Sequence, residues 1–220
     1  MAERTLYSYW RSQASYRVRI ALAWKGLGAE IASLDLIKGD QFAASFRALN
    51  PEAAVPTLIE GEGAPLIQSL AILEYLEECH PEPPLLPREP RARAHARALG
   101  QVVAMDAHPL VVPRVRHYLA HELGLGDHAL KHWIRHWLDR GTETLEAMLA
   151  RDPRTGRFCV GDAPTLADLC LVPHVTTARM LYDADVSAYP TVARIYEACM
   201  ALPEFAGTGP VHQPDAPLTA

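Results

Sequence analysis

A proline-rich stretch constrains the fold of this 220-residue chain more than any other feature. Five prolines lie between Pro81 and Pro90. Because proline lacks a backbone N–H and fixes φ, this density interrupts regular structure and is typical of a semi-rigid linker. Strand and helix patterns alternate before the linker, whereas only helical patterns follow it. We therefore predict two domains, residues 1–82 and 91–220, joined by a linker at 83–90.

The first part of the sequence is predicted to be a small α/β domain. Alternating apolar residues predict four strands, 5–9, 30–36, 56–60 and 65–68. Helical periodicity predicts three helices, 15–25, 42–49 and 69–79. The apolar face of the first helix excludes Arg17 and Arg19, which are left available to point elsewhere. This order of elements indicates a small α/β sandwich.

The second part is predicted to be all helical. From residue 91 to about residue 202 the breaks fall near Pro109, 124–126, 152–156 and Pro190. Thr165 and Asp168 have the spacing of a capping box and precede an apolar helical run, which indicates a role in folding. The tail 207–220 is rich in proline, glycine and small residues and is predicted to be irregular.

Composition and charge exclude several functions. The net charge is −5 and no basic stripe is present, which argues against a nucleic-acid partner. No apolar run approaches the roughly 20 residues of a membrane span, so no membrane association is expected. The N-terminus has no signal-peptide pattern, and we expect a cytoplasmic location.

Cysteine and histidine spacing predicts neither disulfides nor a metal site. The four cysteines, Cys79, Cys159, Cys170 and Cys199, are widely scattered. Three histidines spaced by four stack on one helix face: His128, His132 and His136. Because no carboxylate or thiolate motif accompanies them, we expect a polar face and no metal.

The turn at residues 11–15 is the best candidate for chemistry. A strand pattern ends at Tyr9, and a helix follows directly, with Ser12 and Ser15 where that helix begins. Free backbone N–H groups and the helix dipole favour an anion there, and a serine hydroxyl can donate a hydrogen bond to a thiolate. The alternative is a simple N-cap, worth about 1 kcal/mol.

Several motifs together resemble a known family. The segments 55–57 and 68–69 resemble the glutathione-binding domain of glutathione transferases, and 12–22 resembles the zeta class, the branch of maleylacetoacetate and maleylpyruvate isomerases. The segments 48–51 and 161–173 agree with this branch. The resemblance extends from Leu6 to Pro214. It implies a thioredoxin-like α/β N-terminal domain, an all-α C-terminal domain, glutathione as cofactor and a homodimer.

The resemblance implies how glutathione is held. Pro56 would follow a cis peptide bond, and the backbone of Val55 would pair with the cysteinyl unit. Gln68 and Ser69 would hold the γ-glutamyl carboxylate at a helix N-terminus. The alternatives are a trans proline that begins a strand and a serine that only caps a helix.

Two further residues match family positions that face glutathione. Gln41 matches a position that contacts the glycyl end of the peptide. His108 lies in the helical domain and would reach glutathione from that side, although a capping or surface histidine is an equal alternative.

The implied reaction is a glutathione-dependent cis–trans isomerisation of a dicarboxylate keto acid. Ser12 would donate a hydrogen bond to the glutathione sulfur, with Arg11 beside it as a second catalytic group. Arg11, Arg114 and Arg179 would bind the substrate carboxylates, since arginine suits bidentate carboxylate recognition. For each of these arginines the alternative is a solvated surface charge.

The sequence departs from the zeta motif at two positions. Gln13 and Ala14 stand where the motif reads Ser-Cys, so no mechanism that needs the motif cysteine applies. Maleylacetoacetate is the first choice of substrate and maleylpyruvate the second. Two other functions stay open: a transferase acting on small α-halo acids, and a glutathione-binding interaction protein without catalysis.

Overall fold

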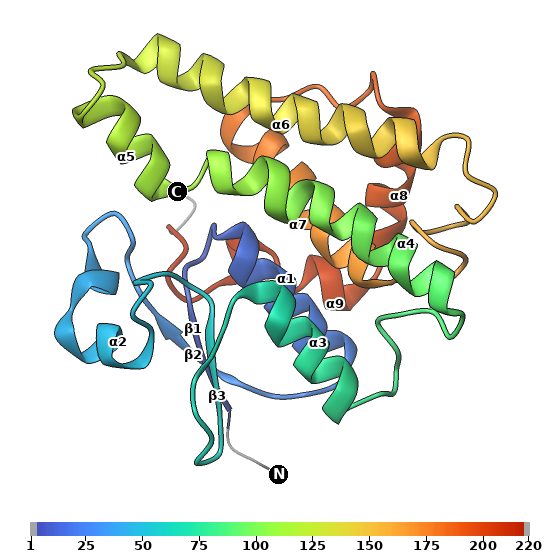
Figure 1. Cartoon of the computed structure of the whole chain (residues 1–220), viewed down its shortest axis with the longest axis horizontal. Coiled ribbons are helices and arrows are strands. Elements are labelled where there is room, and N and C mark those ends of the chain that lie inside the picture. The colour runs from blue at the N-terminus through green and yellow to red at the C-terminus, as the bar shows by residue number, and fades with distance from the viewer. Residues whose placement is uncertain (1–3, 218–220) are drawn as a thin grey trace. The chain divides into compact units, whose positions relative to one another are not determined.

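A computed structural model describes residues 4–217 as two compact units (Figure 1). The first unit contains the chain up to Leu85 together with the segment from Leu202 onward, and the second is Leu86–Ala201. The sequence pattern predicts that all of 91–220 belongs to the helical domain. The structure differs, because the segment from Leu202 folds against the N-terminal residues.

The first unit is built around a four-stranded mixed sheet. Its strands are β1 (Arg4–Ser8), β2 (Glu30–Ser33), β3 (Thr57–Glu60) and β4 (Leu66–Ile67). The order is β2-β1-β3-β4, with β1 parallel to β2 and antiparallel to β3, and β3 antiparallel to β4. The helices of this unit's N-terminal part are α1 (Gln13–Trp24), α2 (Ala44–Leu49) and α3 (Ser69–Cys79).

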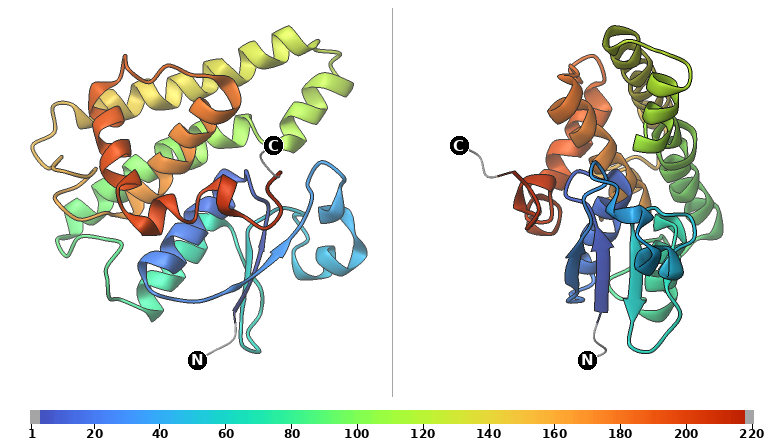
Figure 2. Two further views of the ribbon diagram at one scale, coloured as in Figure 1. Left: turned by 180° about the vertical axis from the view of Figure 1, so that it is seen from behind. Right: turned by 90° about the vertical axis from the view of Figure 1, so that its left-hand side faces the viewer.

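Helices cover both faces of this sheet. Figure 1 and Figure 2 show α1 and α3 side by side on one face and α2 on the other. Alternation along β1 places Leu6 and Tyr7 on opposite faces, and the Tyr7 ring lies 5.4 Å from that of Phe46 in α2. Six apolar residues of α1 and α3 are fully buried: Val18, Ile20, Ala21, Ile72, Leu73 and Leu76.

Two arginines of α1 do not face solvent. Arg17 and Arg19 are only 2% and 4% exposed, whereas the apolar pattern alone left them pointing elsewhere. Both guanidinium groups find hydrogen-bond acceptors inside the unit, at Ser69 and at Ser8 respectively. The periodicity identified the apolar face of the helix correctly. The fold also buries residues of the helix that lie outside this face.

The last segment of the chain contains two short helical turns. They are α9 (Pro203–Ala206) and the 3-10 turn η4 (Pro210–His212). Figure 2 shows this segment beside α1, and the Tyr16 hydroxyl donates a hydrogen bond to the carbonyl of Phe205 over 2.7 Å. The tail is therefore a packed part of the first unit.

The second unit is all helical. Its helices are α4 (Pro90–Gln101), α5 (Pro113–His121), α6 (Asp127–Leu149), α7 (Leu166–Tyr182) and α8 (Pro190–Met200). Directly after α4 the winding widens to a π-helix, η2 (Val102–Ala107), and then tightens to a 3-10 turn, η3 (His108–Leu110). No helix within residues 4–217 is both long enough and apolar enough to cross a bilayer.

The predicted capping box is present at the start of α7. Asp168 is fully buried and accepts hydrogen bonds from the backbone N–H of Thr165 over 2.7 Å and of Cys159 over 2.9 Å. Burial raises the pKa of this carboxyl, although the hydrogen bonds act in the opposite direction. Its other partners are the Thr165 hydroxyl of the cap and the thiol of Cys199 over 3.8 Å, so the carboxylate is bound on all sides by groups of the fold, which supports the predicted folding role.

Candidate functional site

The turn between β1 and α1 holds Ser12 at the N-cap of the helix. The Ser12 N–H donates to the carbonyl of Tyr9 over 3.0 Å, which closes the turn. Its Oγ accepts a hydrogen bond from the backbone N–H of Ser15 over 3.2 Å. The sequence pattern of a strand followed by a serine and a helix therefore gives the predicted capping geometry.

Capping leaves the Ser12 hydroxyl able to donate. A serine oxygen has two lone pairs and one O–H, and only one lone pair is used by the Ser15 N–H. The 12-residue helix α1 adds the positive end of its dipole at this point. The turn can thus cap the helix and still offer an O–H to an anion beside it.

Arg11 directly precedes Ser12 and brings a cation to this turn. Its guanidinium carbon lies 5.6 Å from the ring centre of Tyr9 and 5.7 Å from that of Trp10. Among residues 4–217, Arg11 forms no ion pair. The aromatic rings therefore hold the guanidinium group in position, and its charge remains available to an anionic ligand.

The loop before β3 places Val55 near the Ser12 turn. The Val55–Pro56 peptide bond is cis, as predicted. Val55 packs with Tyr9 in one buried cluster, and the β1–β3 ladder ends at the pair of Tyr7 and Thr57. Within the described chain, the backbone groups of Val55 take part in no hydrogen bond, so an extended ligand can pair with them.

The N-terminus of α3 carries Gln68 and Ser69. Gln68 has a positive φ of 68°, uncommon for a residue with a side chain, and holds the N-cap position. Ser69 is the first helical residue, and its Oγ accepts a hydrogen bond from the guanidinium of Arg17 over 3.1 Å. The Gln68 amide donates to Glu52 at the surface over 2.7 Å. This end of α3 combines a helix dipole with a buried cation.

Gln41 lies in the 3-10 turn η1 (Asp40–Phe42). It is buried, and its amide nitrogen lies 3.4 Å from the carbonyl of Leu36, a long hydrogen bond. Its Oε1 has no partner among the described residues. Leu36 packs against the cluster that contains Tyr9 and Val55, which links Gln41 to the turn.

The structure thus gathers the predicted residues of the first unit around one end of its sheet. Tyr9 connects the Ser12 turn with Val55, and Arg17 connects α1 with Ser69.

The three site residues predicted in the second unit lie on three different helical segments of that unit. His108 begins η3 and is half-buried, and Arg114 is exposed in the first turn of α5. Arg179, near the end of α7, pairs with Glu197 over 3.0 Å and lies over the Tyr196 ring at 5.2 Å. Arg179 is therefore engaged in a surface ion pair.

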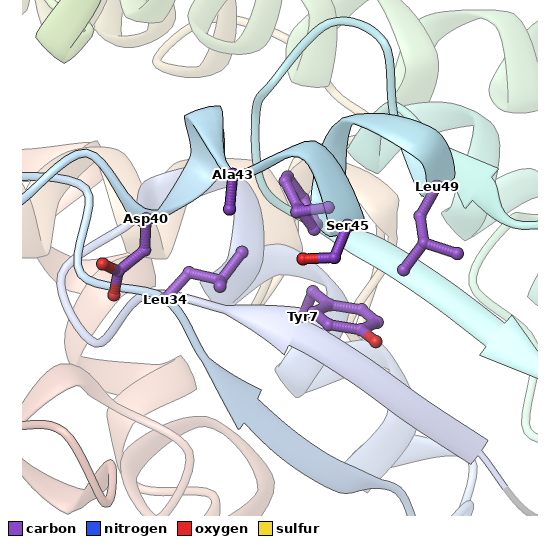
Figure 3. A pocket seen from close by; sticks show the side chains of 7 residues that line it. Tyr7, Leu34, Asp40, Ala43, Ser45 and Leu49 are labelled. Atoms are coloured by element: carbon purple, nitrogen blue, oxygen red, sulfur yellow. The ribbon is translucent and has the colours of Figure 1, made fainter.

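A separate cavity of about 250 Å³ lies between the sheet and α2 (Figure 3). None of the predicted site residues lines it. The lining consists of Tyr7, Leu34, Asp40, Ala43, Ser45, Phe46 and Leu49. We assign no part of the site to this mainly apolar cavity.

The histidines of the helical unit do not assemble with other potential metal ligands. His117 and His121 stack with ring centres 4.3 Å apart. In the part of the chain that the structure describes, no three histidine, cysteine, aspartate or glutamate side chains come together as a metal site would need.

Comparison with known proteins identifies the family. Residues 2–78 match the family model of the glutathione S-transferase N-terminal domain, and residues 131–198 match that of the C-terminal domain. A probable maleylacetoacetate isomerase of Vibrio cholerae is 44% identical, over 98% of this chain and 100% of that protein.

Two solved structures agree closely with the fold. A maleylacetoacetate isomerase of Methylobacterium extorquens AM1, with bound malonate and glutathione, is 50% identical at a TM-score of 0.95, over 97% of this chain and 99% of that one. A maleylpyruvate isomerase described as a bacterial zeta-class glutathione transferase is 40% identical at a TM-score of 0.93, over 97% and 100%. The chain belongs to the zeta class of the glutathione transferases.

Within this class, the chain's departures from the motif lie on the first turn of α1. Gln13 is buried, and its Oε1 has no partner within residues 4–217; the same holds for the Oγ of the fully buried Ser15. Ala14 supplies no polar group. Of the four residues from Ser12 to Ser15, Ser12 is the half-exposed hydroxyl at the N-cap.

Sequence reasoning missed three polar groups that support the site, Arg17 at the start of α3 and Arg19 and Asp215 at the turn. Both Arg17 and Arg19 lie in the segment 12–22 that resembles the zeta class, but the sequence predicts no role for either. Asp215 accepts a hydrogen bond from the N–H of Trp10 over 2.9 Å across 205 positions of sequence. Arginines on an otherwise apolar helix were the only available signal for the first two.

Proposed function

We propose that this zeta-class transferase is a glutathione-dependent cis–trans isomerase that converts maleylacetoacetate to fumarylacetoacetate. Maleylpyruvate is the second candidate substrate. The proposal is supported by relatives of near full-length similarity that carry these two names, and by the geometry at Ser12.

The residues of the first unit fit glutathione. The backbone of Val55 offers a strand-like donor and acceptor for the cysteinyl unit. Ser69, held by the buried Arg17, offers a hydroxyl and a helix N-terminus to the γ-glutamyl carboxylate, and Gln68 stands beside it. Gln41 would contact the glycyl end. His108 of the helical unit would complete the contacts.

Ser12 activates the thiol. Its hydroxyl donates a hydrogen bond to sulfur, while its oxygen accepts the Ser15 N–H and is thereby fixed in direction. A hydrogen bond to the charged form, together with the dipole of α1, lowers a thiol pKa from its ordinary value of about 8.5. No side chain at position 14 takes part, because Ala14 has no polar group.

When bound, glutathione supplies a thiolate that adds to the cis double bond, allows rotation about the resulting single bond, and leaves again as the trans double bond re-forms. Addition and elimination of the thiolate are opposite steps, so the overall reaction needs no oxidant, reductant or net proton. We assign to Arg11 the stabilisation of the negative charge that develops on the conjugated carbonyl oxygen, because Arg11 directly precedes Ser12 in the chain and its guanidinium, held over the Tyr9 and Trp10 rings, forms no ion pair within residues 4–217.

The substrate carries two carboxylates, so more than one cation is required. We assign Arg11 to one of them, with Arg114 and Arg179 of the helical unit as the other cations. Arg179 must exchange its surface partner Glu197 for substrate. That exchange costs little, since exposed ion pairs contribute at most about 1 kcal/mol.

The Ser12 hydroxyl is the strongest support for this function, because it caps α1 through its oxygen and keeps its hydrogen for an anion. The test is an assay of maleylacetoacetate and maleylpyruvate with and without glutathione. Wild type is compared with Ser12→Ala and with Ser33→Ala, a matched control at an exposed position of β2.

We expect glutathione-dependent formation of the trans isomer that Ser12→Ala lowers by about 100-fold and Ser33→Ala leaves unchanged, the loss typical of one preorganised donor. The preferred substrate then identifies the enzyme. Glutathione binding without turnover of either substrate would overturn the isomerase proposal and leave the two alternatives, a transferase for α-halo acids or a binding protein.

A homodimeric state and a cytoplasmic location stay predictions. Both come from the resemblance and the composition. Size-exclusion chromatography with light scattering tests the first, and cell fractionation tests the second.

A further inference from the structure

The last segment of the chain is fastened to the first unit by polar contacts to α1. The Arg19 Nε donates to the carbonyl of Thr208 over 3.0 Å, and the Tyr16 hydroxyl donates to that of Phe205 over 2.7 Å. Inside the segment, the Gln213 amide donates to the carbonyls of Thr208 and Gly209, both over 3.1 Å. These hydrogen bonds fix the position of the chain directly before Asp215.

Asp215 and Arg19 bind the backbone N–H and the backbone carbonyl of Trp10, respectively. The Trp10 N–H donates to the Oδ2 of Asp215 over 2.9 Å, and the Trp10 carbonyl accepts from the Nη2 of Arg19 over 3.1 Å. Arg19 also donates to the Ser8 hydroxyl over 3.0 Å and, more weakly, to the Tyr9 carbonyl over 3.4 Å. The chain entering the Ser12 turn therefore has its polar backbone groups fixed by one buried cation and one carboxylate.

The two charges belong to one buried arrangement. Burial lowers the pKa of Arg19 to about 10, while the charges of Tyr16 and Asp215 act in the opposite direction, so the guanidinium stays protonated at neutral pH. The Oδ1 of Asp215 is buried and has no partner among the described residues. Its position is thus set by the protein around it and not by solvent.

We propose that Asp215 and Arg19 are positioning residues for the reaction, and that the C-terminal segment clamps Trp10 so that Arg11 and Ser12 keep their places. This inference rests on the proposed function of Ser12 and Arg11. The turn spans only from the Tyr9 carbonyl to the Ser12 N–H, so a shift at Trp10 is passed directly to both site residues. A displacement of about 1 Å at a reacting group can lower a rate about 100-fold.

The test compares Asp215→Ala and Asp215→Asn with a matched control, Asp185→Asn. Asp185 also accepts a backbone N–H, from Ser187 over 2.8 Å, but on an exposed loop of the other unit. A second pair of variants ends the chain after Gln213 or after Pro217, so that only the first loses Asp215. For each, kcat, the KM for glutathione, the thermal midpoint and the pKa of the bound thiol are measured, the last by ultraviolet absorbance of the thiolate.

We expect Asp215→Ala and the chain ending at Gln213 to lower kcat at least about 10-fold and to move the bound thiol pKa toward that of free thiol. Asp215→Asn keeps an acceptor for the Trp10 N–H and should show a smaller effect. Asp185→Asn and the chain ending at Pro217 should match wild type.

A lower thermal midpoint with unchanged kcat and unchanged thiol pKa would overturn the inference, because the tail would then only stabilise the fold. A wild-type chain that lowers the pKa of bound thiol but isomerises neither substrate would overturn the proposed function while the thiol readout still decides the role of Asp215. A wild-type chain that binds no glutathione would overturn both.

Discussion

The guanidinium of Arg17 donates a hydrogen bond to the hydroxyl of Ser69 over 3.1 Å, and both side chains are buried. The bond ties the first turns of α1 to the N-terminus of α3. Because the Ser69 oxygen accepts from Arg17, its own O–H stays available to a carboxylate. Arg17 therefore orients the group that we assign to the γ-glutamyl end of glutathione.

Ser69→Ala and Arg17→Lys are each expected to weaken glutathione binding about 10-fold or more, the value of one hydrogen bond to a charged group. If Arg17 acts through Ser69, the double variant should bind glutathione no more weakly than the single variant that has the lower affinity. Calorimetric titration measures all three, with Arg47→Lys on the exposed side of α2 as control. Fully additive losses would show that the two side chains act independently.

Lys25→Met is expected to lower the free energy of unfolding by about 3–5 kcal/mol, since it leaves a buried carboxylate without its charge partner. The fully buried Lys25 Nζ donates to Glu77 over 3.0 Å and to the carbonyls of His80 and Pro83 over 2.6 and 2.9 Å. Urea unfolding measures the loss. Lys38→Met, at a lysine that is 78% exposed and paired with Asp35, should leave stability essentially unchanged. Equal effects of the two substitutions would show that the buried Lys25–Glu77 pair contributes no more than an exposed one.

Stability should fall in acid partly through Glu60. Burial alone would raise the pKa of this carboxyl, but the hydrogen bond from Tyr75 and the charge of Arg4 outweigh it, and the pKa is lowered. The same contact raises the pKa of Tyr75 to about 12. A carboxyl with a lowered pKa stabilises the fold above its unfolded value, about 4.5, and this contribution is lost as the pH falls through the folded value.

Glu60→Gln should therefore reduce stability near neutral pH and flatten its dependence on pH below about 5. Unfolding followed by circular dichroism across this range tests it, with the exposed Glu62→Gln as control. If the stability of Glu60→Gln falls with decreasing pH as steeply as that of wild type, the contacts of Glu60 do not favour its charged form.

Gly141→Ala is expected to destabilise the helical unit by about 1–3 kcal/mol, the usual cost of overpacking. A Cβ at Gly141 of α6 would lie 2.9 Å from the Cβ of Ala107 and 3.0 Å from the ring of His174. Helix propensity alone predicts the opposite sign, a gain of about 1 kcal/mol. Thermal unfolding decides between them. Gly126→Ala, where the added Cβ meets nothing within 4 Å, is the control.

Local sequence signals predicted most elements of the fold to within a few residues. The helix 69–79 begins and ends as predicted, because apolar periodicity and turn residues bound it on both sides. The strand predicted at 30–36 ends at Ser33, since the Asp35 carboxylate accepts the N–H groups of Ile37 and Lys38 and turns the chain. An aspartate followed by a break in alternation was an available signal for that turn.

Contacts between distant residues were beyond sequence reasoning. The Ser12 cap is local and was found, whereas the bond from Trp10 to Asp215 joins positions 205 apart and leaves no periodic trace. For the same reason the tail was assigned to the helical domain. Arg17 and Arg19 are polar residues buried by tertiary hydrogen bonds, which overrides the usual exposure of arginine.

The fate of glutathione during turnover distinguishes an isomerase from a transferase. Substrate is supplied in large excess over glutathione, and the trans product and the free thiol are both quantified over time. We expect conversion to continue to completion with all of the thiol recovered, because addition and elimination at the Ser12 site return it unchanged. Conversion that stops after one equivalent, with the thiol lost to a stable conjugate, would contradict this expectation and show a transferase.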